Sequence, residues 1–292
     1  MMDLSGSIVA IVTPFDSTGE LDMDAYVSLL DWHVDSGTAA IVVAGSTGES
    51  GSLSAGEKDR LIAAAVEQVN GRVPVIAGTG AAATAATIEA TRRAAALGAD
   101  AALVVTPYYV RPPQRGLVAH FRAVADATDL PLLLYNVPSR TGVDMLPSTV
   151  EQLSGYRSII GLKEANASIE RMRELVRTVG GQMILLSGDD DSCARSIAEG
   201  ARGVISVVAN VAPAMMADLC RMGLEGRSDQ AAVLSDQMQP LFKAMSCDSN
   251  PIPVKWALAQ QGRCKDHVRL PLVSLASEQH ATVRDAMSEL IQ

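Results

Sequence analysis

One lysine in this sequence stands where a covalent nucleophile is expected. Lys163 directly follows the apolar run Ile159–Leu162, so its side chain should emerge at the rim of a buried strand. Burial disfavours the charged form of an amine, and a neutral amine can attack a ketone to form a Schiff base. The alternative is a structural lysine paired with a neighbouring carboxylate such as Glu164. Lys163 is therefore the first candidate for catalysis, with an ion pair as its competing role.

Two other segments carry groups suited to the same chemistry. Tyr135 also lies at the end of an apolar run, and its phenol can both donate and accept a proton. A core aromatic residue is the alternative at that position. The segment Gly45–Gly48 (GSTG) combines glycines, hydroxyls and backbone N–H groups, which together can form a nest for a carboxylate. A plain tight turn is the alternative there.

These groups need a scaffold that brings strand ends together, and the apolar runs predict one. The runs are nearly continuous in Val, Ile, Leu and Ala, which is typical of parallel strands buried on both faces. Catalytic residues in a barrel of such strands lie at the carboxyl ends of the strands. The eight runs are Ile8–Pro14, Ala40–Gly45, Pro74–Gly80, Ala102–Tyr109, Leu130–Pro138, Ile159–Glu164, Met183–Gly188 and Gly203–Ala209.

Helical periodicity fills the segments between the runs, and Ser54 with Glu57 forms a capping-box pattern. Repeated strand–helix order predicts an α/β fold, a (β/α)₈ TIM barrel, over residues 1–212. Residues 213–292 are expected to hold the last barrel helix and a C-terminal helical extension. The expected helices include Asp24–Ser36, Ser54–Val69, Thr84–Leu97, Asn166–Val179, Pro213–Met222, Asp229–Met245, Pro253–Gln261 and Ser277–Ile291.

The composition argues against several classes of function. The chain has 292 residues, of which 48% are hydrophobic, enough for one barrel-sized core. A net charge of -9 without any basic run argues against a nucleic-acid partner. The run Ile8–Val12 is too short for a signal peptide or a membrane span, so no membrane partner is expected. The four cysteines form no CxxC pair, which favours reduced thiols and a cytoplasmic location.

The sequence carries no cofactor or metal motif. Its histidines lack the spacing of metal ligands, and Gly78-Thr79-Gly80 lacks the third glycine of a dinucleotide fingerprint. We interpret Asp189–Asp191 as a capping segment. One of its residues would cap a helix beginning near Ser192, and the others would favour the positive end of the helix dipole. Neither a cofactor nor a metal is expected.

Several motifs together resemble a known enzyme family. GSTGE at 45–49, YNVP at 135–138 and GLKEA at 161–165 look like the pyruvate-dependent superfamily that includes N-acetylneuraminate lyase. The narrower resemblance is to the dihydrodipicolinate synthase (4-hydroxy-tetrahydrodipicolinate synthase) family, and it covers essentially the whole chain. It rests on VTPYY at 105–109, YNVPSRTG at 135–142, LSGDD at 186–190, GVISVVAN at 203–210 and NPIPVKW at 250–256.

The resemblance implies a condensation of pyruvate with L-aspartate 4-semialdehyde on the route to diaminopimelate and lysine. Lys163 would form the Schiff base with pyruvate. Tyr135, Ser46 and Tyr109 would relay protons, with Tyr109 reaching in from a neighbouring subunit. The family resemblance therefore implies a homo-oligomer, with a tetramer built as a dimer of dimers, and no cofactor.

The same resemblance assigns the binding groups. Backbone N–H groups at Ser46 and Thr47 would hold the pyruvate carboxylate. Arg140 would bind the carboxylate of the semialdehyde, because a guanidinium has the shape for it. Gly188 and the main chain of Ile205 would line the pocket.

One departure and two alternatives bear on this assignment. Ser46 stands where much of the family has threonine, which keeps the hydroxyl but loses the methyl group that restricts its rotamer. Another class I pyruvate aldolase or lyase, acting on a sialic acid or a 2-keto-3-deoxy sugar acid, would keep Lys163 and Tyr135. Arg140 favours an acidic aldehyde over that alternative. A barrel without activity would lack at least one of the catalytic groups.

The resemblance also leads to a prediction about regulation. Lysine-sensitive relatives bind the effector in a dimer-interface cleft through polar side chains. Here Ala55, Ala82 and Ala86 stand where polar or acidic residues would be expected, and Lys58 adds a cation. We therefore predict weak inhibition by L-lysine or none, unless Glu89 replaces the missing carboxylate.

Overall fold

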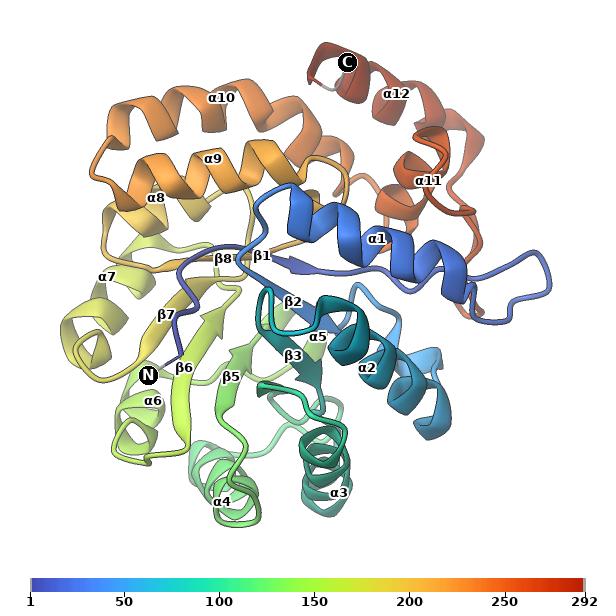
Figure 1. Ribbon diagram of the computed structural model, residues 1–292. Helices are drawn as coiled ribbons and strands as arrows, with labels where there is room; N and C mark the ends of the chain where they lie inside the picture. Colours follow the sequence, from blue (N-terminus) through green and yellow to red (C-terminus); the bar gives the residue numbers. More distant parts are fainter. Residues whose placement is uncertain (1, 291–292) are drawn as a thin grey trace.

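Eight parallel strands close into a barrel in the order of the sequence (Figure 1). The structure is a computed structural model, which describes residues 2–290. Strand β1 pairs with both β2 and β8, which closes the ring. The prediction of a (β/α)₈ barrel is confirmed. The strands are β1 (Gly6–Ala10), β2 (Ala40–Val43), β3 (Val75–Gly78), β4 (Ala101–Val105), β5 (Leu132–Asn136), β6 (Ile159–Glu164), β7 (Ile184–Ser187) and β8 (Gly203–Ser206).

Helices surround the barrel and alternate with its strands (Figure 1). Helix α2 begins with the predicted capping box, in which Ser54 accepts from the N–H of Glu57 and Glu57 accepts from that of Ser54. The helices around the strands are α1 (Met23–Asp35), α2 (Ala55–Val69), α3 (Thr84–Ala96), α4 (Gln114–Asp126), α5 (Pro138–Thr141), α6 (Pro147–Leu153), α7 (Ile169–Val179), α8 (Cys193–Ala198) and α9 (Pro213–Leu224).

Most strands are shorter than the apolar runs that predicted them. Strand β4 ends at Val105, and β8 ends at Ser206 before the short 3-10 helix η2 (Val208–Asn210). After β1 and β8 the apolar residues continue because they are buried in loops across the end of the barrel, as at Val12 and Val208, whereas Tyr108 and Tyr109 after β4 are exposed. Helix α7 begins at Ile169 instead of Asn166, because the Ser168 side chain accepts from the N–H of Arg171 and caps it there.

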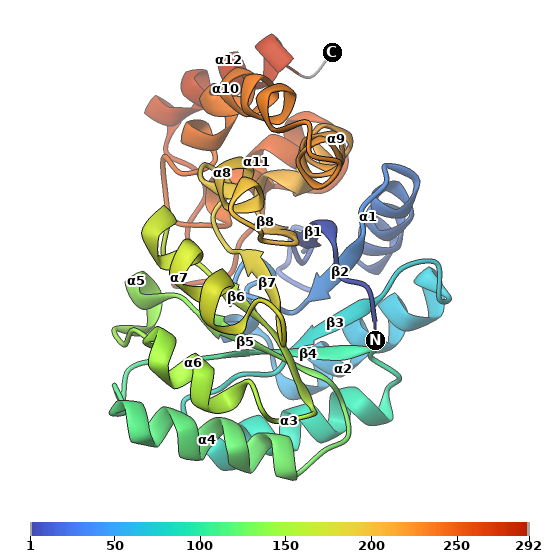
Figure 2. The ribbon, with the colours of Figure 1, turned by 90° about the vertical axis from the view of Figure 1, so that its left-hand side faces the viewer.

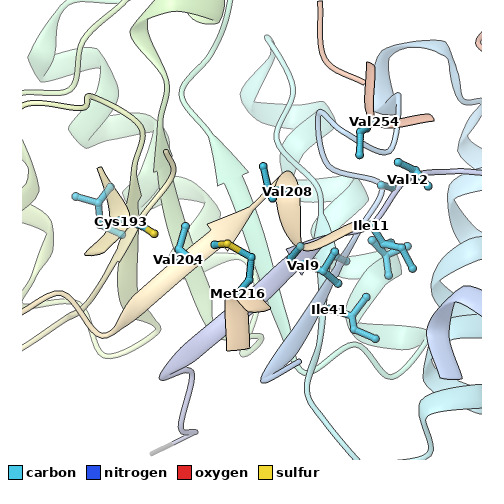
Figure 3. Close-up of a cluster of buried hydrophobic side chains, with 14 of the residues drawn as sticks. Val9, Ile11, Val12, Ile41, Cys193, Val204, Val208, Met216 and Val254 are labelled. Carbon is cyan, nitrogen blue, oxygen red and sulfur yellow. The ribbon is translucent and has the colours of Figure 1, made fainter. Parts of the chain in front are cut away.

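The barrel has two buried layers, one inside the ring of strands and one between strands and helices. The inner layer includes Ile8, Val42 and Leu186. In the outer layer, Val9 of β1, Val204 of β8 and Met216 of α9 lie together (Figure 3). Burial on both faces explains the continuous apolar runs and fixes the direction in which each strand-end side chain points.

The C-terminal helices lie over one side of the barrel, next to α8 and α9 (Figure 2). They are α10 (Ser228–Ala244), α11 (Ile252–Gln260) and α12 (His280–Leu290), with the 3-10 helix η3 (Ser277–Gln279) before α12. Val254 of α11 lies beside Val12 of the loop after β1 (Figure 3). The expected helix end at Ile291 falls outside the described residues. The boundary at 212/213 falls just before α9, and the division into two parts remains a prediction.

No helix in residues 2–290 has the length and apolar character needed to cross a membrane.

Candidate active site

A cavity of about 290 Å³ opens at the carboxyl ends of the strands. Its walls come from the loops after β2, β5, β7 and β8 and from the segment before α11. The sequence-predicted residues among its lining are Ser46, Thr47, Tyr135, Arg140, Lys163 and Gly188. The structure thus brings six of the eight predicted site residues together.

Lys163 lies near the end of β6, directly opposite Tyr135 of β5 in the strand register. Its side chain is 5% exposed, and its Nζ lies 4.3 Å from the centre of the Tyr135 ring. None of the ion pairs within residues 2–290 involves Lys163. An amine buried against an aromatic ring without a carboxylate partner is suited to nucleophilic attack.

The carboxylate next to Lys163 in sequence is occupied elsewhere. Glu164 accepts hydrogen bonds from Asn136 Nδ2, at 3.0 and 3.1 Å, and from the N–H of Asn166 at 2.8 Å. Its nearest cation is Arg171, at 3.9 Å. Burial raises the pKa of Glu164 to about 7. The competing role of Lys163 as a partner of Glu164 is therefore not found.

The GSTG segment forms a turn that is closed by two backbone hydrogen bonds. The N–H of Glu49 donates to the carbonyl of Ser46 at 3.1 Å, and that of Ser50 donates to Gly45 at 3.2 Å. Among the described residues, no acceptor is found for the N–H groups of Ser46 and Thr47. Two amide donors at a cavity wall can receive an anion.

Gly188 is required by the path of Lys163. A Cβ atom at this position would lie 2.9 Å from Cε of Lys163 and 2.8 Å from Cβ of Ala165. A side chain at position 188 would therefore displace the lysine from the cavity. Sequence analysis predicted Gly188 only as a pocket wall, and this clearance gives the physical reason for a glycine.

Arg140 lies in α5 at the mouth of the cavity and is exposed. Its Nη2 donates to the carbonyl of Asn250 at 3.5 Å, and it takes part in no ion pair within the described part of the chain. A second cavity of about 470 Å³ adjoins the first and shares Arg140, Gly188 and Asn250 with it. A guanidinium at this junction can bind an anionic group.

Two predicted site residues lie outside the cavity of their own chain. Tyr109 is 91% exposed and has a left-handed backbone with φ of 71°. Ile205 is fully buried inside the barrel, and Val207 from the same segment lines the cavity instead. The roles of Tyr109 and Ile205 therefore remain predictions.

The aspartate run differs from its interpretation as a capping segment. Asp189 Oδ2 accepts from the N–H and the hydroxyl of Ser192, but Ser192 is itself the N-cap of α8, so the prediction that an aspartate caps this helix is wrong. Asp190 instead accepts from the N–H groups of Val207 and Val208, both at 3.0 Å, and joins the loops after β7 and β8. Burial raises its pKa. No group of three His, Cys, Asp or Glu residues suited to a metal ion occurs in residues 2–290.

The comparisons with known proteins agree with this geometry. The sequence model of the Dihydrodipicolinate synthetase family matches residues 3–290. The chain belongs to the dihydrodipicolinate synthetase family. A 4-hydroxy-tetrahydrodipicolinate synthase from Pseudomonas aeruginosa is 47% identical over 286 residues, covering 98% of each chain. A crystal structure of the chloride-inhibited dihydrodipicolinate synthase from Acinetobacter baumannii complexed with pyruvate is 43% identical, with a TM-score of 0.97 over 98% of this chain and 99% of that one.

A further dihydrodipicolinate synthase, from Cyanidioschyzon merolae with lysine bound, is 36% identical and covers 99% of both chains, with a TM-score of 0.95. The predictions of the family and of an enzyme of the lyase class are confirmed. Relatives that match nearly the whole chain are named 4-hydroxy-tetrahydrodipicolinate synthase.

Asn250 is a polar residue of the cavity that the sequence patterns did not predict. Asn250 lies just before α11, and its Nδ2 donates to Thr47 Oγ1 at 2.9 Å. Its Oδ1 is buried and has no hydrogen-bond partner within the described residues. The NPIPVKW motif contained the signal, because it belongs to the family resemblance although it lies far from the barrel strands in sequence.

Proposed function

We propose that this cavity condenses pyruvate with L-aspartate 4-semialdehyde through a Schiff base on Lys163. The observation that carries the proposal is a buried, unpaired lysine amine 4.3 Å from the Tyr135 ring, beside a turn with two free N–H groups. Pyruvate has one ketone and one carboxylate, and the cavity offers one group for each. No cofactor is expected for this chemistry.

The first step is attack of the Lys163 amine on the ketone carbon of pyruvate. A C–N bond forms, the ketone oxygen leaves as water after two protonations, and the iminium makes the methyl group acidic. Loss of a methyl proton gives an enamine, whose carbon can attack the aldehyde. The N–H groups of Ser46 and Thr47 hold the carboxylate and so orient the ketone toward Nζ.

Proton transfer at the ketone oxygen and at the aldehyde requires a group that both donates and accepts. We assign this to Tyr135, with the hydroxyl of Ser46 and Tyr109 of a neighbouring subunit extending the relay. Exposure of Tyr109 on its own chain is consistent with a residue that acts in a partner's cavity. Tyr108 and Val110 beside it are also exposed, which suits an interface at this loop.

We further propose a homotetramer, built as a dimer of dimers, working in the cytoplasm. The support is the family together with the exposed segment Tyr108–Val110. Co-assembly of Tyr109→Phe and Lys163→Ala chains tests the shared cavity. Mixed oligomers should regain activity, and their continued inactivity would show that each cavity is complete within one chain.

Arg140 is assigned to the carboxylate of the semialdehyde. An aldolase for sialic acid or a keto-deoxy sugar acid would instead meet a hydroxylated chain at this place. Arg140→Ala should remove about 2 kcal/mol of transition-state stabilisation, which lowers kcat/KM for the semialdehyde roughly 30-fold. Formation of the pyruvate adduct should be nearly unchanged. Equal losses in both steps would show that Arg140 positions the relay.

The proposed function is tested by trapping the Schiff base. Borohydride added with pyruvate should place a reduced pyruvyl group on the peptide that contains Lys163, as read by mass spectrometry. A coupled assay with a panel of aldehydes then identifies the second substrate. An adduct on Lys255 or Lys243, or a preference for a sugar-derived aldehyde, would overturn the proposal.

A further inference from the structure

The carboxylate turn is held from outside the cavity by a buried ion pair. Glu49 follows the GSTG segment and has a left-handed backbone, with φ of 55°. Its side chain is 1% exposed and points away from the cavity toward α11. A residue other than glycine stays in this backbone region only where its surroundings fix it.

The partners of Glu49 come from the C-terminal helical region. Lys255 of α11 donates from Nζ to Glu49 Oε1 at 2.7 Å and to the carbonyl of Thr13 at 2.8 Å. The N–H of Arg269 donates to Glu49 Oε2 at 3.0 Å. Thr13 in turn donates from its hydroxyl to the carbonyl of Gly48 at 2.7 Å. The turn is thus tied at two adjacent residues, Gly48 and Glu49, to one lysine of α11.

Stability alone is a poor reason for this arrangement. Both side chains of the pair are almost completely buried, and taking two charges out of water costs as much as their attraction returns. Apolar residues of similar size commonly stabilise such a place equally well. What the pair supplies that apolar residues cannot is direction, because its hydrogen bonds fix the carboxylate of Glu49 and, through Thr13, the carbonyl of Gly48.

We propose that Glu49 and Lys255 are positioning residues that hold the N–H groups of Ser46 and Thr47 in the orientation that binds the pyruvate carboxylate. Helix α11 is thereby part of the active site, although neither residue of the pair lines the cavity. This inference rests on the proposed function, since it assumes that a carboxylate binds at the turn.

Three variants separate positioning from stability: Glu49→Gln, Lys255→Met and the double variant. Each single variant leaves one buried charge unpaired, so both should unfold more easily and show a KM for pyruvate raised about 10-fold. The double variant has no unpaired charge and should regain much of its thermal stability. Its KM for pyruvate should stay raised, because the turn has lost its directional bonds. The KM for the semialdehyde should change less than twofold, and kcat only slightly.

Gln261→Met is the matched control. Gln261 directly follows the same helix, and its Nε2 donates to the carbonyl of Val211 at 3.0 Å, another contact between the C-terminal region and the barrel. This variant should lose stability while keeping the KM for pyruvate. If Glu49→Gln gives no folded protein, Glu49→Asp carries the test, because it keeps the charge and shortens the side chain by one methylene. Its KM for pyruvate should rise severalfold.

The outcomes distinguish this inference from the proposed function. If the wild-type protein forms no adduct on Lys163, the proposed function fails. If the wild type is active and the KM for pyruvate recovers together with stability in the double variant, the pair serves only stability and the positioning role is overturned. Unchanged KM values in every folded variant would overturn it as well.

Discussion

Two lysines are buried at the same end of the barrel, in surroundings that differ by one carboxylate. Lys163 is 5% exposed and Lys255 is fully buried. Nζ of Lys163 lies 4.3 Å from the centre of the Tyr135 ring, and Nζ of Lys255 lies 4.2 Å from that of the Phe15 ring. Only Lys255 has an anionic partner, Glu49, at 2.7 Å.

The difference shows how the same side chain acquires different roles. A carboxylate in contact favours the ammonium and occupies its hydrogen atoms, so Lys255 is a structural cation. Desolvation lowers the pKa of Lys255, and the charge of Glu49 opposes that shift. Lys163 faces a cavity and has no such partner among residues 2–290, so its amine is available to a ketone. Proximity to an aromatic ring does not distinguish the two lysines, whereas the carboxylate does.

The strongest test of this comparison removes each amine in turn. Lys163→Met should lower kcat by about 10⁴-fold or more, because no other group can form the Schiff base. The borohydride adduct should disappear while the protein remains folded by circular dichroism. Lys265→Met, at an exposed lysine of the same chain, serves as the control and should keep full activity. An adduct that persists in Lys163→Met would reverse the roles of the two lysines.

The second test measures stability at the paired lysine. Lys255→Met should lower the free energy of unfolding by about 3–5 kcal/mol, because it strands the carboxylate of Glu49 in the interior. Lys163→Met should change stability far less, since it leaves no charge unpaired. Urea unfolding of the two variants gives the comparison directly. Equal destabilisation would mean that the carboxylate is not the feature that separates them.

A third buried group, Glu164, is a carboxylate whose only close cation among the described residues, Arg171, is 3.9 Å away, compared with 2.7 Å for Glu49 and Lys255. Its pKa of about 7 means that the folded protein holds a proton that the unfolded chain releases above about pH 4.5. The resulting stabilisation is present at low pH and is lost as the pH rises through 7. Between pH 5 and 8, the wild type should lose on the order of 3 kcal/mol relative to Glu164→Gln.

Urea unfolding at the two pH values measures this loss. His33, whose pKa burial lowers to about 3, changes stability in the opposite direction, but it does so equally in both proteins and cancels. Glu174→Gln, at an exposed position, is the matched control and should follow the wild type. Parallel pH profiles for the wild type and Glu164→Gln would show that Arg171 and the hydrogen bonds keep Glu164 ionised.

Local sequence was sufficient to predict the position of Lys163 but not the partner of Lys255. Lys163 follows an apolar strand, and strand geometry alone places it at the rim of a barrel beside Tyr135. The pair of Glu49 and Lys255 joins residues 206 positions apart, through a helix whose docking no local pattern predicts. The role of Asp190 was predicted wrongly for the same reason, because the N–H groups that donate to its carboxylate lie in the loop after the next strand. Strand ends are predictable from periodicity, whereas contacts between distant loops require the packed fold.

Free L-lysine also carries an ammonium group. If a close carboxylate is what holds an ammonium, as at Lys255, the affinity of the protein for free lysine depends on whether its binding cleft offers one. A cleft of about 240 Å³ includes Ala86, Lys58 and Tyr108 in its lining, and we predict that it is the place where an effector lysine would have to bind. Arg93 and Asp59, also in its wall, are paired with each other. Burial and the charge of Arg93 lower the pKa of Lys58. The two positive charges would repel a further cation in this cleft.

Glu89 does line this cleft, but it is exposed and its charge acts on Arg93. The effector's ammonium therefore lacks the close carboxylate that Lys255 has. Each missing charged hydrogen bond costs about 1.5–3 kcal/mol, so two of them weaken binding by two or more orders of magnitude. Millimolar L-lysine should leave the activity nearly unchanged, whereas Ala86→Glu should make the enzyme measurably sensitive. Strong inhibition of the wild type at that concentration would show that Glu89 supplies the missing carboxylate, and that an exposed partner is enough to hold an amine.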